Sequence, residues 1–188
     1  MSIRVRPLLD NLKATGRRPL VKLLPDYDFL PDETAGIFPS ALLNALARKD
    51  KYSIIGILSE QLVLGEMPLE VNSIWPILAK YGITVGEPER EKVAKSKTTR
   101  DYFAKLEATR DQLHEYLIAM EQHTVIELEQ ECIYECVEGH PDGVCGKTVI
   151  EVKTTGKLED NIEYFMLQLC AYVAMGDFNH AKIGRAHV

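Results

Sequence analysis

The stretch of sequence that decides the fold begins with a turn and continues into a strand. It reads His140-Pro141-Asp142-Gly143-Val144-Cys145-Gly146-Lys147-Thr148-Val149-Ile150-Glu151-Val152-Lys153-Thr154. Turn-forming residues gather at 139–143, and residues 147–154 are rich in β-branched side chains, which favours a strand. Eight residues separate Asp142 from Glu151, so we expect the two carboxylates to meet across a hairpin.

The strand places two charged side chains on one face. Residues two apart in a strand point to the same side, so Glu151 and Lys153 project together. Ile150 and Val152 project into the opposite layer. The carboxylates of Asp142 and Glu151, with the backbone carbonyl of Val152, then make an oxygen site suited to Mg²⁺ or Mn²⁺. The competing interpretation is that this Glu-x-Lys is an ordinary exposed ion pair.

A cation at this position indicates a hydrolytic reaction. It would polarise a scissile phosphate and lower the pKa of a bound water. Lys153 could orient that water or offset the charge that develops on the phosphate. A site of this kind could therefore activate a water for hydrolysis, with Asp142, Glu151 and Lys153 as its central residues.

An amphipathic helix is predicted at residues 158–175. Its apolar residues recur at helical spacing and predict a buried stripe of Ile162, Phe165, Met166, Leu169, Cys170 and Val173. Gln168 and Tyr172 lie one turn apart beside this stripe. These two residues are either a neutral polar flank of the helix or part of the site.

Together these motifs resemble the PD-(D/E)XK nuclease superfamily. Pro141-Asp142, eight residues and Glu151-Val152-Lys153 have the form of its signature. The stretch from Gln168 to Tyr172 resembles the QxxxY motif of its RecB-like, phage λ exonuclease-like branch. The resemblance implies an α/β fold with a restriction-endonuclease-like αβββαβ core, a small mixed sheet flanked by helices. It also implies that Gln168 helps to hold the active site and that Tyr172 lies near the nucleic acid.

The superfamily often has a fourth acidic or histidine residue on the helix before the first strand. Leu113-His114-Glu115 resembles the Leu-His-Glu of many RecB-like nucleases, although the usual preceding Gly-Thr is absent. His114 is therefore the preferred further catalytic residue and metal ligand. Glu107, Glu115 and Glu121 stay open as alternatives.

The resemblance covers the second half of the chain. We expect a helical region at residues 1–98 and the nuclease core at residues 99–182. The helices predicted from apolar spacing lie at residues 41–46, 53–64, 69–81 and 100–121. The predicted strands lie at residues 124–128, 132–137, 147–154 and from 180 onward. Residues 89–98 are either a linker or the start of a helix.

The last six residues, Ile183 to Val188, match the translation of a common short-read sequencing adapter, whose next codon in that frame is a stop. We therefore expect native sequence to end near Lys182 and the core to be truncated at its C-terminus. Such a gene would come from environmental reads, which suits a microbial, phage or viral source.

The charge of the chain is acidic overall. The chain has 188 residues, 46% of them hydrophobic, and a net charge of −6. Contacts with nucleic acid would therefore need a local basic surface. Lys95, Lys97 and Arg100 are the residues predicted to provide it, and a solvated helix face is the competing interpretation.

Other features of the composition point to an intracellular protein. The sequence shows no secretory signal and no apolar run long enough to span a membrane, so we expect no membrane partner. The cysteines lack the spacing of a zinc site and do not resemble the iron–sulfur pattern of some superfamily members. We expect them to be buried thiols.

The expected function is that of a Mg²⁺- or Mn²⁺-dependent deoxyribonuclease, an exonuclease that acts in DNA recombination or repair. Three alternatives stay open. The first is a structure- or sequence-specific endonuclease of the same superfamily. The second is a catalytically inactive nucleic-acid-binding domain. The third is a helical interaction protein in which the motif is accidental.

Overall fold

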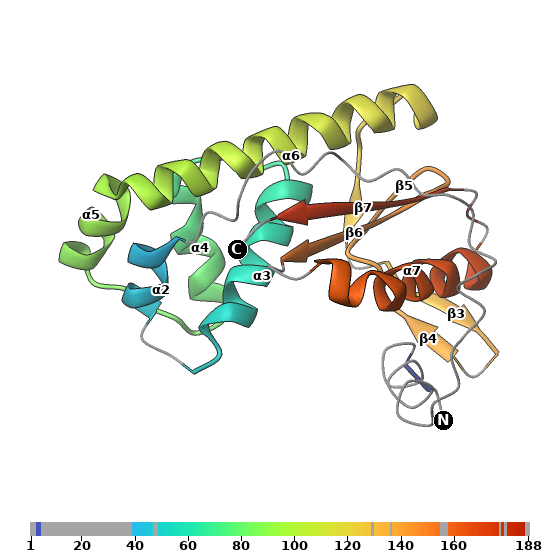
Figure 1. Ribbon diagram of the computed structural model, residues 1–188, viewed down its shortest axis with the longest axis horizontal. Helices are drawn as coiled ribbons and strands as arrows, with labels where there is room; N and C mark the ends of the chain where they lie inside the picture. The colour runs from blue at the N-terminus through green and yellow to red at the C-terminus, as the bar shows by residue number, and fades with distance from the viewer. Residues whose placement is uncertain are drawn as a thin grey trace. The chain divides into compact units, whose positions relative to one another are not determined.

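The computed structural model describes residues 3–4, 39–46, 49–128, 130–135, 137–154, 158–176, 178 and 180–186. In this part of the chain the fold is mixed α/β, as predicted, with six α-helices and small, mainly antiparallel sheets (Figure 1). The described residues form two compact units. Unit 1 takes in residues 3–4, 116–151 and 158–183, and unit 2 residues 39–115, 152–154 and 184–186, within the described ranges. None of the helices described combines the length and apolar character that crossing a membrane requires.

Unit 2 is built mainly from helices. Its helices are α2 (Ser40–Leu46), α3 (Lys51–Leu64), the short 3-10 helix η2 (Val71–Ser73), α4 (Ile74–Lys80), α5 (Glu87–Lys95) and most of α6 (Lys97–Glu121). They confirm the helices predicted from apolar spacing. The linker interpretation of residues 89–98 is wrong, because α5 and α6 occupy this stretch and only Ser96, with an extended backbone, separates them.

The apolar faces of these helices make the core of unit 2. Its most deeply buried side chains are Leu42, Leu43, Ile55, Leu58, Leu62, Ile74, Ile77, Leu78, Tyr102, Leu106 and Leu113. One polar pair lies among them: the hydroxyls of Ser59 and Tyr102 are 2.7 Å apart. Because Ser59 donates to the Ile55 carbonyl at 2.8 Å, Tyr102 is the donor of the shared bond. Burial raises the pKa of the Tyr102 phenol, and the bond with Ser59 opposes part of that shift.

This buried pair predicts a pH-dependent stability. We expect Tyr102→Phe to lower the free energy of unfolding by about 1 kcal/mol at neutral pH, because a buried hydrogen bond is lost. The folded-state pKa of Tyr102 lies above the unfolded-state value of about 10. The phenol therefore stabilises the fold fully below about pH 10 and progressively less above it.

Urea unfolding at about pH 9 and about pH 10.5 measures this effect. As the pH rises between these two values, the free energy of unfolding of wild type should fall by about 1 kcal/mol more than that of Tyr102→Phe. The control is Tyr52→Phe, which alters a tyrosine that is 57% exposed and should behave like wild type. Equal losses in wild type and Tyr102→Phe would contradict the assignment.

Unit 1 contains α7 (Leu158–Met175) and most of the strand residues. The strands are β1 (Ile3–Arg4), β2 (Glu127–Leu128), β3 (Cys132–Tyr134), β4 (Val137–Gly139), β5 (Gly143–Cys145), β6 (Thr148–Thr154) and β7 (His180–Ala186). They form a three-stranded sheet in the order β1-β4-β3 and a four-stranded sheet in the order β2-β5-β6-β7. β7 confirms the strand predicted from residue 180 onward.

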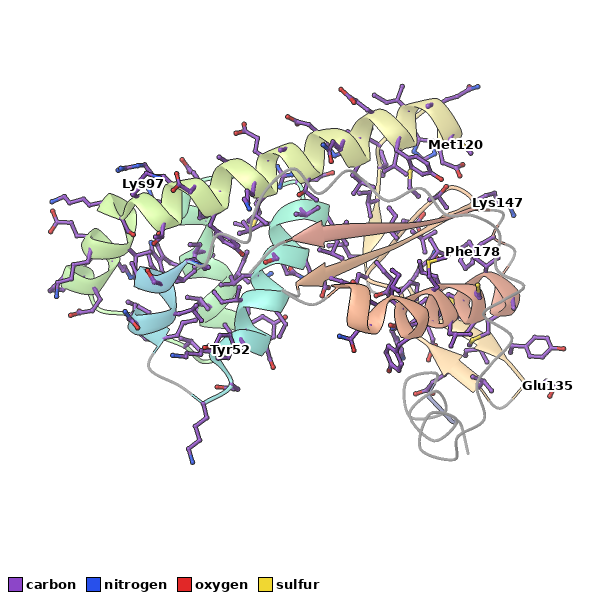
Figure 2. All side chains as sticks on the ribbon, in the orientation of Figure 1. Tyr52, Lys97, Met120, Glu135, Lys147 and Phe178 are labelled. Carbon is purple, nitrogen blue, oxygen red and sulfur yellow. The ribbon has the colours of Figure 1, made fainter. Side chains whose placement is uncertain are left out.

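The prediction of three strands between the two helices is wrong, because five strands, β2 to β6, lie between α6 and α7 in the described residues. The predicted strand at 132–137 is a hairpin, in which β3 and β4 pair antiparallel with Tyr134 opposite Val137. Glu135, labelled in Figure 2, lies at the turn of this hairpin. Its φ is 53°, in the left-handed region. Gly143, predicted as part of a turn, is the first residue of β5.

α7 confirms the helix predicted at 158–175, but its buried face differs from the predicted stripe. Leu169 and Tyr172 pack against Val149 of β6 and form the centre of an apolar cluster. Gln168 is also buried, whereas Cys170, which belonged to the predicted stripe, is exposed. The helix therefore turns the side that carries Gln168 and Tyr172 toward the sheet.

Candidate active site

The hairpin of β5 and β6 brings Asp142 and Glu151 to the same end of one strand pair. The two strands pair antiparallel, with Gly143 opposite Ile150, and a turn at Gly146–Lys147 joins them (Figure 2). Asp142 directly precedes Gly143, and Glu151 directly follows Ile150. The two carboxylate residues therefore adjoin the last residue pair of this register.

Both faces of β6 are covered. Glu151 is 1% exposed and Lys153 is 8% exposed, while Ile150 and Val152 on the other face are also buried. α7 packs on the face of Glu151, because its contact with Val149 lies on that same side of the strand. The interpretation of Glu151 and Lys153 as an ordinary exposed ion pair is therefore wrong.

Gln168 connects Glu151 to Tyr172. Its Nε2 atom lies 2.8 Å from the Tyr172 hydroxyl and 3.4 Å from Oε1 of Glu151, and it donates to both. The Tyr172 hydroxyl donates in turn to the carbonyl of His140 at 3.3 Å. Three residues that the sequence assigned to one site are thus joined by hydrogen bonds.

The other end of the Gln168 amide is an acceptor without a partner. Its Oε1 atom is buried and makes no hydrogen bond with the described residues. The orientation of the amide follows from its neighbours: a carboxylate only accepts, and the Tyr172 hydroxyl gives its proton to His140. Both neighbours therefore need the N–H side of the amide. A buried, unpaired carbonyl is costly, so this oxygen suits a donor such as a water in the site.

The oxygen atoms of these residues fit a magnesium-like cation that keeps part of its water shell. Mg²⁺ is commonly held by one or two carboxylates and keeps several of its waters. Asp142 and Glu151 are two carboxylate residues at the same end of the β5–β6 pairing, Val152 has the next carbonyl along β6, and Gln168 Oε1 is an acceptor for a water. The described residues contain no group of three or more His, Cys, Asp or Glu placed to bind a metal. The fit is therefore to a hydrated hard cation, not to a site closed by side chains.

The candidates for a fourth ligand are Glu121 in unit 1 and three residues in unit 2. Glu121 accepts a hydrogen bond of 2.6 Å from the hydroxyl of Thr148. Thr148 and Glu151 are three residues apart in β6 and point to opposite faces, so Glu121 binds the face away from Glu151. His114, Glu107 and Glu115 lie on the part of α6 that belongs to unit 2. The role of His114 as catalytic residue and ligand stays a prediction.

The residues predicted to contact phosphates have acidic and backbone partners. Lys95 pairs with Glu91 at 2.7 Å, and Lys97 pairs with Asp101 at 2.5 Å. Arg100 donates to the carbonyl of Lys95 at 3.2 Å. The lysine side chains are more than two thirds exposed, so the surface carries both signs of charge. A role in binding nucleic acid stays a prediction for all three basic residues.

The described cysteines carry reduced thiols. Cys132 and Cys145 are buried, as predicted, and Cys170 is exposed. Burial raises the pKa of all three thiols, and Glu121 and Glu127 add to the shift at Cys145. These thiols are therefore protonated at neutral pH, which suits small apolar side chains. Cys136 lies outside the described residues.

Sequence reasoning missed the part that His140 plays. Its contribution is a backbone carbonyl, which any residue type supplies, so no side-chain pattern marks it. The available signal is its position two residues before Asp142. The contact between Thr148 and Glu121 was missed for a different reason, because it joins residues that are far apart in the sequence.

Comparisons of the chain with protein-family models, curated proteins and solved structures found no match.

Proposed function

We propose that the chain is a divalent-metal-dependent nuclease that hydrolyses phosphodiester bonds, with Asp142, Glu151 and Lys153 at its centre. The observation that carries this proposal is the register of β5 and β6. Asp142 and Glu151 directly adjoin the last residue pair of this register, and Lys153 follows Glu151 two residues later on the same face of β6. The contact of Gln168 with the buried Glu151 supports it.

The order of elements supports a restriction-endonuclease-like core of the PD-(D/E)XK type. With the β3–β4 hairpin set aside, the order is α6-β2-β5-β6-α7-β7, which is αβββαβ, and the four strands are neighbours in one sheet. The arrowheads of β6 and β7 point the same way in Figure 1, as expected for neighbouring strands joined by a helix. In this proposal the β3–β4 hairpin is an addition to the core.

Each central residue has a distinct role in the proposal. The carboxylates of Asp142 and Glu151 and the carbonyl of Val152 hold Mg²⁺ or Mn²⁺. When bound, the cation polarises the phosphate and lowers the pKa of a water. Lys153 orients the attacking water or offsets the charge on the phosphate. Gln168 holds the Glu151 carboxylate in place through its N–H group.

The proposed task is exonuclease cleavage of DNA in recombination or repair, because Gln168 and Tyr172 resemble the QxxxY motif of the RecB-like branch. An endonuclease of the same superfamily is the alternative within this class, and closed circular DNA separates the two. An obligate exonuclease degrades linear duplex and leaves the closed circle intact. Binding of DNA without cleavage would instead favour an inactive binding domain.

The test is cleavage of labelled linear DNA, closed circular DNA and RNA with Mg²⁺, with Mn²⁺ and with EDTA. We expect cleavage of linear DNA with either metal and none with EDTA. Asp142→Ala, purified in parallel, should lose the activity because one of the two proposed carboxylate ligands is gone. Asp111→Ala, which alters an exposed aspartate, is the matched control and should cleave like wild type.

Two results would overturn the proposal. One is equal cleavage by wild type and Asp142→Ala, which would trace the activity to a contaminating enzyme or to another site. The other is the absence of metal-dependent cleavage on both DNA and RNA substrates.

A further inference from the structure

The hydroxyl of Tyr172 connects the two segments that carry the carboxylates. It accepts a hydrogen bond from Gln168 Nε2 at 2.8 Å and donates one to the His140 carbonyl at 3.3 Å. Gln168 contacts Glu151, and His140 lies two residues before Asp142. A single hydroxyl therefore couples the segment that leads to Asp142 with the residue that contacts Glu151.

We propose that Tyr172 is a positioning residue of the metal site. Its hydroxyl holds the Gln168 amide on Glu151 and fixes the segment that leads to Asp142, so that the two carboxylates keep the spacing that a divalent cation needs. This inference rests on the proposed function. It gives Tyr172 a role different from the one that the resemblance implies, in which this tyrosine lies near the nucleic acid.

The burial of Tyr172 supports a role inside the protein. The residue is 3% exposed, and it packs with Val149 and Leu169 in one apolar cluster. A base stacks only on an aromatic face that is open to it. The ring is enclosed by apolar side chains, and the hydroxyl both donates and accepts within the chain. Tyr172 therefore acts through Gln168 and His140.

The direction of the hydrogen bonds explains why the hydroxyl matters. Tyr172→Phe keeps the packed ring and removes only the oxygen. Gln168 Nε2 then loses the closer of its two acceptors, and its longer contact with Glu151, at 3.4 Å, no longer fixes the amide alone. An amide that turns would bring Oε1 toward the Glu151 carboxylate, and two acceptors repel each other. The His140 carbonyl loses its donor in the same step.

The experiment compares wild type, Tyr172→Phe and Tyr134→Phe, all as the full chain. Tyr134 is 57% exposed and provides the same chemical change at a ring that is not buried. The first measurement is the exchange rate of the Gln168 side-chain amide protons, followed by NMR in EDTA and assigned with Gln168→Met. The second is the dissociation constant of Mn²⁺ from calorimetry, without nucleic acid. We expect about tenfold faster exchange and about tenfold weaker Mn²⁺ binding in Tyr172→Phe alone.

A double variant makes the test independent of general destabilisation. Gln168→Met removes the other partner of the shared hydrogen bond. If the two residues act as one unit, the double variant should have about the same Mn²⁺ dissociation constant as the single variant that binds Mn²⁺ less tightly. If the fold-change in the Mn²⁺ dissociation constant of the double variant equals the product of the two single fold-changes, the residues act separately. This result would overturn the inference.

The outcomes separate this inference from the proposed function. Unchanged amide exchange in Tyr172→Phe, or faster exchange with wild-type Mn²⁺ affinity, would overturn the positioning role and leave the nuclease proposal standing. A wild type that binds no Mn²⁺ and cleaves no nucleic acid would overturn the proposed function, and the metal-site role of Tyr172 with it. The exchange rates in EDTA would still decide whether the hydroxyl fixes the amide.

Discussion

Glu151→Gln is expected to lower metal-dependent cleavage by about 10³-fold, which corresponds to about 4 kcal/mol of transition-state free energy. The substitution keeps the size of the side chain and removes its negative charge. Asp142 then remains as the single proposed carboxylate ligand of the cation. Rates measured under saturating Mg²⁺ and Mn²⁺ would distinguish a loss of catalysis from a loss of metal affinity.

The same substitution should separate metal-bound from metal-free stability. Glu151 is 1% exposed and accepts a hydrogen bond from Gln168, so its carboxylate is buried with a partner. The free energy of unfolding in EDTA, compared with that of wild type, measures the effect of the substitution on the metal-free fold. Excess Mn²⁺ should stabilise wild type, since a ligand that binds only the folded state raises the free energy of unfolding. It should stabilise Glu151→Gln much less.

The matched control is Glu131→Gln, which makes the same change at an exposed position of unit 1. It should keep wild-type cleavage and wild-type stabilisation by Mn²⁺. Full activity in Glu151→Gln would remove this residue from the proposed site. A large loss of stability in EDTA would show instead that the buried carboxylate holds the fold together.

The sequence predicted β6 because local rules fix it. The β-branched run favours a strand, and the alternation of a strand sets Glu151 and Lys153 on one face. The predicted turn at 139–143 is wrong at its end, because β5 begins at Gly143 and the turn that joins β5 to β6 lies at Gly146–Lys147. β5 was missed because three residues are too few to show a strand pattern. The long helices could be predicted equally well, since their apolar residues recur at helical spacing over several turns.

The neighbouring hairpin was missed because its turn lacks the usual signals. Glu135 takes a positive φ of 53° in a run that contains no glycine, asparagine or proline until Gly139. Periodicity therefore predicted one continuous strand where β3 and β4 form two. Whether such a run forms one strand or a hairpin depends on tertiary contacts, which single-residue propensities do not include.

The orientation of α7 was missed for a related reason. Its apolar spacing predicts a stripe that includes Cys170, yet Gln168 is 3% exposed and Cys170 is exposed. The packing of Leu169 and Tyr172 on Val149 selects the buried face. A polar residue can enter that face only where it finds partners, which Glu151 and Tyr172 provide for Gln168. The residue whose burial the periodicity did not predict, Gln168, is therefore a residue of the candidate site.

Arg110→Met is expected to lower the free energy of unfolding by about 3 kcal/mol. Nη2 of Arg110, on α6, donates to the carbonyls of Gly65 at 3.1 Å and Met67 at 3.0 Å, and also to that of Leu62. The last carbonyls of a helix have no partner within it, and a positive charge at this end is favourable. Arg110 thus caps α3 and attaches it to α6.

Burial and the neighbouring carboxylates act in opposite directions on the charged form of Arg110, and burial is the larger effect. Burial lowers the pKa of the Arg110 guanidinium, and the neighbouring Asp111 and Glu107 oppose that shift. The side chain stays protonated at neutral pH, since an arginine does not lose its proton in that range. Its Nε atom is buried and has no partner among the described residues, which subtracts from the gain. The net benefit therefore comes from the carbonyl contacts of Nη2.

Two further variants test this assignment by urea unfolding. Arg100→Met is the matched control, because Arg100 is an exposed arginine of the same helix that donates to one carbonyl, at 3.2 Å, and its loss should cost less than about 0.5 kcal/mol. Arg110→Lys keeps the charge but loses the planar fork, so it should fall between wild type and Arg110→Met. If Arg110→Lys had the free energy of unfolding of wild type, a positive charge at the end of α3 would be enough to stabilise the helix without the planar guanidinium. If Arg110→Met matched Arg100→Met, the carbonyl contacts would contribute nothing, and the stability of α3 would have to come from its apolar face alone.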